Sequence, residues 1–166
     1  ACFNPATNSY KRFFSGGKDA HPSNYLPLYS LLEFEKKYFW LGTLGDGFVK
    51  FDTENLAYST YNEKNGLANN VVYAMLPDKK NNLWIATNKG ISKFNIETER
   101  FKNYDMNDGL PGNEFNTGAY FMDKKGTLYF GSTDGLLYFN PDSLVENQNP
   151  PQIAVTNFKI FDRAVS

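Results

Sequence analysis

The 166-residue sequence has few of the residues that carry most catalytic and metal chemistry, with one cysteine and one histidine. Because Cys2 is alone, an internal disulfide and a cysteine-based zinc site are both excluded. No apolar run approaches the roughly 18 residues that a membrane-spanning helix needs. Seventeen basic and eighteen acidic residues leave a formal net charge of −1. The sequence therefore predicts no nucleic-acid partner and no direct contact with a membrane surface.

Aromatic residues are in excess, since 15 Phe, 11 Tyr and 2 Trp make up 17% of the chain. Aromatic side chains favour the half-buried surface of a pleated sheet, whereas the 13 Gly and 8 Pro favour turns. The composition therefore predicts an all-β protein built from short strands.

A sequence pattern of about 45 residues recurs along the chain. Its copies read WLGTLGDGFVKFD (40–52), WIATNKGISKFN (84–95) and YFGSTDGLLYFN (129–140). The leading aromatic residues are 44 and 45 positions apart, which indicates a structural repeat. The positions expected to form the framework of the repeat are Trp40, Trp84, Tyr129, Gly47, Gly90, Gly135, Phe51, Phe94 and Phe139.

Each repeat divides into four short strands, most clearly between residues 71 and 104. The expected strands are 71–76, 83–87, 91–95 and 100–104, joined by turns that contain Gly, Asn or Asp. Four antiparallel strands in about 45 residues are typical of one blade of a β-propeller. The sequence TNKG is then a hairpin turn and not a phosphate-binding loop, because a strand and not a helix follows it.

The expected fold is a partial β-propeller of about three and a half blades over residues 1–140. The expected segments are a half blade at 1–14, blades at 28–61 and 70–104, a three-stranded last blade at 117–139, a linker at 141–151 and the start of a different β-rich domain at 152–166. Propellers close with about four to eight blades. Either the remaining blades of a longer protein or a second copy in a homodimer would complete the ring.

The hairpin LWIATNKGISKFN followed by NDGLPGNEFN resembles the two-component regulator propeller repeats of bacterial hybrid sensor kinases, best known from gut Bacteroidetes. The last repeat followed by PPQIAVTNFKIFDRAV resembles the final blade of such a sensor, where it runs into a tyrosine-rich, immunoglobulin-like domain. The resemblance covers residues 1–140 and 150–166. It departs at EFEKKYF (33–39), which replaces the usual Gly-containing turn, and in the preceding loop, which lacks the usual GL.

The resemblance implies the periplasmic sensor region of a hybrid two-component system. Such sensors typically bind oligosaccharides, and their response regulates polysaccharide-utilisation genes. The chain itself is expected not to be an enzyme, because the kinase would belong to a C-terminal part of the full protein. Three alternatives stay open: a protein-interaction propeller of WD or kelch type, whose signatures are absent, a sensor coupled to a diguanylate cyclase, and a polysaccharide-cleaving propeller enzyme.

The sequence offers no strong catalytic or metal-binding candidate. His21 lies in a polar loop without a nucleophile motif or a second metal ligand. Asp46 and Asp134 each precede a glycine at a hairpin turn, where Asp is a usual turn residue. The sequence YDMNDG (104–109) has the start of a calcium loop but lacks the closing Glu. We therefore predict no catalytic residue, no metal and no cofactor.

A propeller gathers its inter-blade loops, and its turns between second and third strands, on one face. On this face the residues expected to hydrogen-bond sugar hydroxyls are Asn69, Asn70, Asn88, Asn113, Glu114 and Asn116. The candidate aromatic platforms are Phe48, Tyr73 and Phe115. The alternative is that the asparagines are structural, because Asn tolerates turns and left-handed backbone conformations.

Overall fold

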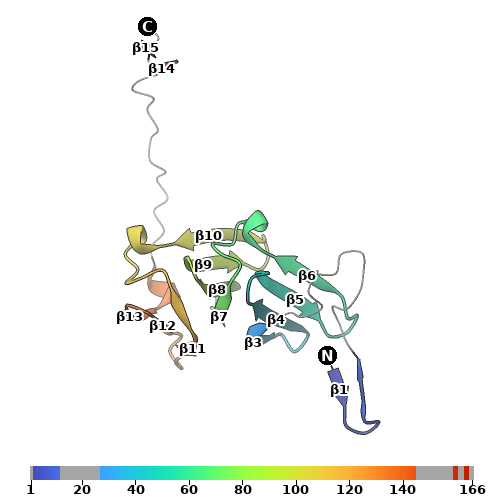
Figure 1. Ribbon diagram of the computed structural model, residues 1–166. Helices are drawn as coiled ribbons and strands as arrows, with labels where there is room; N and C mark the ends of the chain where they lie inside the picture. Colours follow the sequence, from blue (N-terminus) through green and yellow to red (C-terminus); the bar gives the residue numbers. More distant parts are fainter. Residues whose placement is uncertain (1, 12–26, 145–158, 161–162, 165–166) are drawn as a thin grey trace.

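The computed structural model describes residues 2–11, 27–144, 159–160 and 163–164 (Figure 1). Every regular element in these ranges is a β-strand or a short 3-10 helix, so the predicted all-β fold is confirmed. His21 and most of the domain expected at 152–166 lie outside the described residues. Within the described ranges, no helix has the length and apolar character needed to cross a bilayer.

Three antiparallel sheets form the body of the structure, and we number them as blades in chain order (Figure 1). Blade 1 contains β3 (Leu28–Phe34), β4 (Tyr38–Thr43), β5 (Phe48–Asp52) and β6 (Tyr58–Tyr61). Blade 2 contains β7 (Val72–Pro77), β8 (Asn82–Thr87), β9 (Gly90–Asn95) and β10 (Arg100–Tyr104). Blade 3 contains β11 (Phe115–Met122), β12 (Leu128–Ser132) and β13 (Gly135–Phe139).

Two hairpins and three 3-10 helices are the remaining described elements. The hairpins are β1 (Cys2–Asn4) with β2 (Ser9–Lys11), and β14 (Lys159–Ile160) with β15 (Arg163–Ala164). The helices are η1 (Glu63–Asn65), η2 (Met106–Asp108) and η3 (Pro141–Ser143). The first hairpin lies within the range expected as a half blade.

Strand order within a blade explains the sequence of each strand. β8 is buried along its whole length, which is why LWIAT shows no polar alternation. β10 lies at the outer edge of blade 2, where Phe101 and Tyr104 are half-buried and its other residues are exposed. In blade 2 the observed strand ends differ from the expected ones by no more than one residue.

The blades pack face to face through a repeated aromatic contact. Trp40 of blade 1 meets Phe94 of blade 2 edge-on, with ring centroids 5.8 Å apart. Trp84 of blade 2 meets Phe139 of blade 3 in the same way, at 4.8 Å. Tyr129 has the same register in blade 3 and is half-buried. In blades 1 and 2, the tryptophan of the second strand therefore contacts a Phe from the third strand of the next blade.

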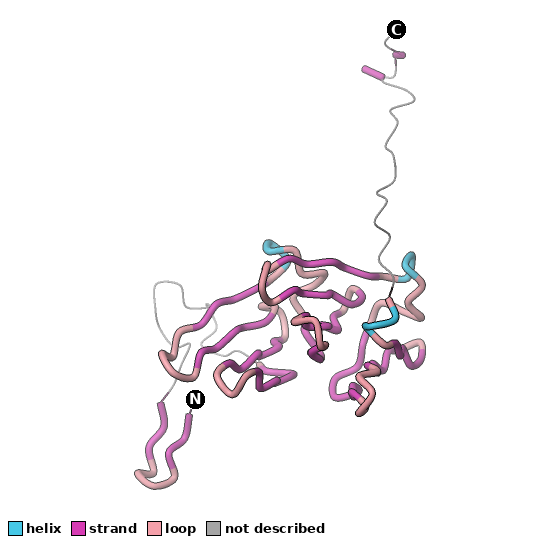
Figure 2. Tube along the Cα trace, turned by 180° about the vertical axis from the view of Figure 1, so that it is seen from behind, coloured by secondary structure: helices cyan, strands magenta, loops and turns pink. Residues whose placement is uncertain are grey.

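The first strands of the three blades lie side by side at the inner edge of the array, where β7 contacts both β3 and β11 (Figure 2). Each first strand carries a β-bulge near its start. Tyr29 and Tyr73 are the single extra residues of the bulges in β3 and β7. In β11 the corresponding irregularity spans residues 116–119. Bulges redirect side chains, and here they lie where the inter-blade loops enter the blades.

Candidate functional site

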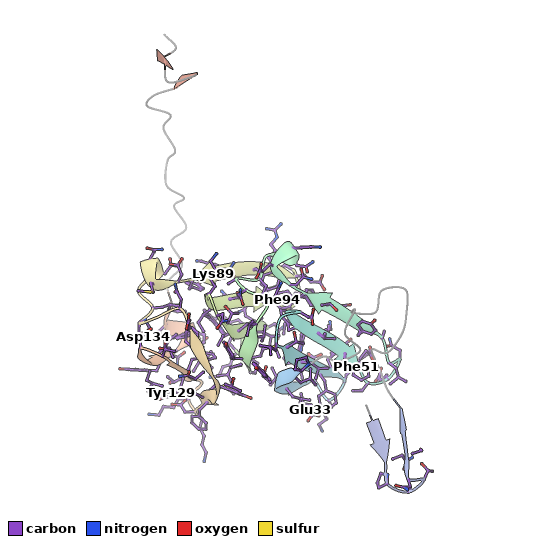
Figure 3. All side chains as sticks on the ribbon, viewed as in Figure 1. Glu33, Phe51, Lys89, Phe94, Tyr129 and Asp134 are labelled. Carbon is purple, nitrogen blue, oxygen red and sulfur yellow. The ribbon has the colours of Figure 1, made fainter. Side chains whose placement is uncertain are left out.

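The inter-blade loops lie against the turns between the second and third strands, as the propeller arrangement predicts. The Gly47 amide donates a 2.8 Å hydrogen bond to the carbonyl of Asn70, and the Gly90 amide donates one of the same length to the carbonyl of Asn113. The segments 62–71, 105–114, 44–47, 88–89 and 133–134 therefore form one surface, which we call the loop face. Figure 3 labels Lys89 and Asp134 in two of its turns.

The loops of this face are held by two equivalent capping boxes at η1 and η2. Asn62 caps η1 and pairs reciprocally with Asn65, while Asp105 caps η2 and pairs with Asp108. Both helices end at a glycine with a positive φ, which is 97° at Gly109. The acidic residues that suggested a partial calcium loop thus serve to cap a helix.

Three of the predicted sugar-binding residues make hydrogen bonds that shape the loops. The Asn70 side-chain oxygen accepts from the Glu63 amide at 2.9 Å, and its equivalent in the next loop, Asn113, accepts from the Met106 amide at 3.0 Å. Asn69 donates to the Glu63 carboxylate at 3.2 Å. These side chains therefore hold the loops of the loop face in shape through hydrogen bonds inside those loops.

Asn88 and Tyr73 form a polar and aromatic cluster with Tyr29. The Tyr73 hydroxyl donates a 2.7 Å hydrogen bond to the side-chain oxygen of Asn88, which lies exposed in the turn of blade 2. The Tyr73 ring stacks on Tyr29 of blade 1, with centroids 5.8 Å apart and planes 15° from parallel. Both tyrosines are half-buried, so each residue keeps some surface exposed to solvent.

The surroundings of Tyr73 raise the pKa of its hydroxyl group. Burial is the main cause that raises the pKa of Tyr73, and the neighbouring Tyr29 and the Glu114 carboxylate raise it further. Glu114 is exposed, and its backbone carbonyl accepts a hydrogen bond from the Thr133 amide at 3.0 Å. The cluster therefore offers a neutral phenol, an amide and a carboxylate beside an aromatic surface.

Two of the three predicted aromatic platforms are wrong. Phe48 is fully buried and packs against Trp40 and Phe94, and Phe115 is 3% exposed and packs against Phe130. Both face the core because their register opposite the second strand turns them inward.

The sequence reading missed Tyr29, which lies outside the three aligned repeat copies. The signal was present, because Tyr29 precedes Tyr73 by the same 44 residues that separate the two tryptophans. Asn116 takes the corresponding position in blade 3 and is exposed. At this position blades 1 and 2 therefore carry a tyrosine, and blade 3 carries an asparagine.

Comparisons with known proteins agree with this geometry. Residues 66–89 match the two-component regulator propeller family. The matched segment is therefore similar to a two-component regulator propeller repeat. The chain also aligns with an extracellular domain assigned to a hybrid two-component system of B. thetaiotaomicron, with a TM-score of 0.75 and 28% identity over 99% of this chain and 23% of that domain.

Of two further relatives, one is similar in sequence and the other shows the fold alone. Histidine kinase P4 of Formosa agariphila is 34% identical over 121 residues, which are 73% of this chain and 8% of the kinase. A second B. thetaiotaomicron extracellular domain of this class shares the fold, with a TM-score of 0.68 and 21% identity over 85% of this chain and 20% of that domain. The chain thus spans less than a quarter of the proteins it matches, and its propeller is similar to those of extracellular domains of hybrid two-component systems.

Two of the carboxylates with a shifted pKa, Asp78 and Asp123, accept hydrogen bonds within turns between strands. Asp78 accepts hydrogen bonds from the Trp84 indole at 2.9 Å and from the Asn82 amide group, while Asp123 accepts from the Thr127 amide and the Tyr129 hydroxyl. These bonds lower the pKa of both carboxyls, the reverse of the shift that a general acid requires. Among the described residues no group of three or more His, Cys, Asp or Glu side chains is arranged to hold a metal ion.

Proposed function

We propose that this chain belongs to the periplasmic ligand-sensing domain of a hybrid two-component sensor kinase, and that the ligand is an oligosaccharide whose parent polysaccharide the regulated genes serve to degrade. The single observation that carries the choice of ligand is the Tyr29–Tyr73 stack beside Asn88. The relatives support the proposal of a sensor, and the side chains of this cluster support the proposal of an oligosaccharide ligand.

The physical argument rests on what a sugar ring presents. One face of a pyranose is lined by C–H groups that pack on an aromatic ring, while its rim carries hydroxyls that both donate and accept hydrogen bonds. The accessible parts of Tyr29 and Tyr73 fit the first requirement, and Asn88 with Glu114 fits the second. A protein ligand would need a larger apolar surface than this cluster provides.

Titration calorimetry of the complete ectodomain against a panel of defined oligosaccharides tests the proposal. For the ligand that binds, Tyr73→Ala is expected to weaken affinity by about tenfold or more, because it removes both the ring and the partner of Asn88. Tyr58→Ala is the matched control, since Tyr58 is a 48% exposed aromatic residue on the outer strand β6. Binding of no oligosaccharide, together with tight binding of a protein, would overturn the ligand class. Equal affinities of the two variants would move the site away from this cluster.

A further inference from the structure

The loop face carries a net negative charge, although the chain as a whole is almost neutral. The acidic residues of this face are Asp46, Glu63, Asp105, Asp108, Glu114 and Asp134, and its basic residues are Lys64 and Lys89. Six carboxylates and two ammonium groups give a formal charge of −4. The whole chain has a charge of −1, so the residues outside the loop face carry +3. Negative charge is therefore concentrated on the face that holds the proposed ligand site.

The fold itself keeps several of these carboxylates on the loop face. Asp105 caps η2, and the Glu63 carboxylate accepts a hydrogen bond of 3.0 Å from the Asn70 amide. Asp134 lies against the neighbouring loop, because a Cβ atom added to Gly112 would overlap its carboxylate. These carboxylates have partners within the protein, so the negative charge is part of the face before any ligand arrives.

Glu114 brings negative charge to the tyrosine cluster itself. Besides burial, which has the larger influence, the Glu114 carboxylate raises the pKa of the Tyr73 hydroxyl, which donates to Asn88. Lys89 follows Asn88 in the same exposed turn and is the basic residue nearest to the cluster along the chain (Figure 3). The cluster thus has one carboxylate and one ammonium group beside it, on a face where carboxylates outnumber ammonium groups by six to two.

The hydrogen-bonding groups of the cluster favour a ligand that donates protons. The Asn88 side-chain oxygen already accepts from Tyr73, and an ionised carboxylate such as Glu114 accepts only. A sugar hydroxyl donates to such a carboxylate, whereas a carboxylate or a sulfate ester on the ligand has no proton to donate at neutral pH. An anionic sugar would therefore meet like charge at Glu114, where an uncharged sugar would form a hydrogen bond.

We propose that the loop face binds uncharged oligosaccharides and discriminates against those that carry carboxylates or sulfate esters. The inference rests on the proposed function and narrows its ligand to one chemical class. Like charges that are brought together at a binding site oppose association, which is a common source of specificity. At physiological ionic strength the Debye length is about 8 Å, so Glu114, which acts on the cluster directly, is expected to contribute most.

Titration calorimetry of the complete ectodomain with matched pairs of oligosaccharides tests the inference. One pair is β-1,4-linked mannotetraose and the β-1,4-linked tetramer of mannuronate, which differ only by a carboxylate in place of each primary hydroxyl. Every other neutral oligosaccharide that binds is paired with its C6-oxidised form. The neutral member is expected to bind about tenfold more tightly or better. Added NaCl is expected to strengthen the binding of the charged member alone, because salt screens the repulsion.

The outcomes separate this inference from the proposed function. Binding of the charged member as tightly as the neutral one, or binding of the charged member that weakens with added salt, would overturn the charge selection and leave the proposed function standing. Binding of no oligosaccharide of either kind would overturn the proposed function, and the inference would fall with it.

Two substitutions of opposite charge distinguish charge from the loss of a contact. Glu114→Gln removes a negative charge and keeps an acceptor, so it should narrow the difference in affinity within a pair by about threefold or more. Lys89→Gln removes a positive charge from the same face, so it should widen that difference.

Glu97→Gln is the matched control for these variants. Glu97 is exposed in the turn between β9 and β10, at the end of β9 away from the loop face, and accepts a hydrogen bond from Asn81. This substitution should leave the difference within a pair unchanged. Shifts in the same direction for Glu114→Gln and Lys89→Gln, or no shift for either, would show that charge on the loop face does not select the ligand.

Discussion

Blades 1 and 2 share a framework but differ at the turn between their first and second strands. In blade 2 the turn spans residues 78–81, and Asp78 accepts a hydrogen bond from the Trp84 indole at 2.9 Å. In blade 1 the turn is only residues 35–37, and the buried Trp40 indole has no acceptor among the described residues. Both tryptophans are nonetheless almost fully buried. Packing against the next blade thus positions the ring, and the carboxylate is a separate source of stability.

Both blades place a lysine over the tryptophan ring, and in blade 2 the Lys93 ammonium lies 5.8 Å from the centre of Trp84. The Lys50 ammonium lies 4.4 Å from the centre of the Tyr38 ring and 5.4 Å from that of Trp40. Lys37 pairs with Glu54 at 2.9 Å across the same end of the sheet. Cation–π contacts use the ring face and leave the indole N–H unpaired. We therefore expect the same substitution to change the stability of the protein by different amounts in the two blades.

The largest effect is expected from removing the tryptophan of blade 2. Trp84→Ala should lower the free energy of unfolding by about 3–5 kcal/mol, because it opens a cavity against Phe139 and leaves Asp78 without a donor. Urea unfolding of the ectodomain measures the change. A loss below about 1 kcal/mol would contradict the packing described here.

A more conservative change separates ring packing from the hydrogen bond. Trp84→Phe should cost about 1–3 kcal/mol, because it leaves a half-buried carboxylate without one of its donors. Trp40→Phe should cost less, because the donor that it removes has no acceptor among the described residues. The two variants, unfolded side by side in urea, give the difference directly. Equal losses would mean that the Asp78 contact contributes nothing to stability.

The smallest effect is a dependence on pH that arises from Asp78. Burial, the largest influence, raises the pKa of this carboxyl, but hydrogen bonds from Asn82, Trp84 and the backbone outweigh it and hold the pKa below the ordinary 3.8. A carboxyl whose pKa is lower in the folded state stabilises the fold above its unfolded-state pKa. This stabilisation is lost as the pH falls through the folded-state pKa.

The stability difference between wild type and Asp78→Asn should therefore be largest near neutral pH and shrink in acid. Thermal unfolding from about pH 6 down to about pH 2 would measure it. A difference that stays constant over this range would assign the effect of the substitution to geometry rather than to charge.

The blades could be predicted from the sequence because the residues that recur with the repeat are each suited to one structural environment. Trp84, Gly90 and Phe94 have equivalents at fixed spacing in the other repeats. The tryptophan needs a core between blades, the glycine needs a turn with positive φ, and the phenylalanine needs the facing surface of the preceding blade. The short turn of blade 1 was also visible, as the departure at EFEKKYF. Only the structure shows that the Trp40 indole N–H has no hydrogen-bond acceptor in the part of the chain that it describes.

The candidate site was harder to predict, because it depends on register near irregular backbone. Phe48 follows a turn and resembles a surface residue in the sequence, yet its pairing opposite Gly42 directs it inward. Tyr73 lies in the bulge of β7 and is half-buried. The usual alternation of inward and outward side chains along a strand therefore does not predict its exposure. The structural roles of Asn70 and Asn113 depend on loop hydrogen bonds that a single sequence does not specify.

The joints between the blades have a consequence for how such a protein can evolve. The bonds from Gly47 to Asn70 and from Gly90 to Asn113 join main-chain atoms only. A side chain such as Lys89, in the turn between these joints, can be exchanged without altering the bond that holds the next blade in place. Selection on the proposed ligand site and selection on how the blades pack therefore act on different atoms, and a lineage can change one while keeping the other.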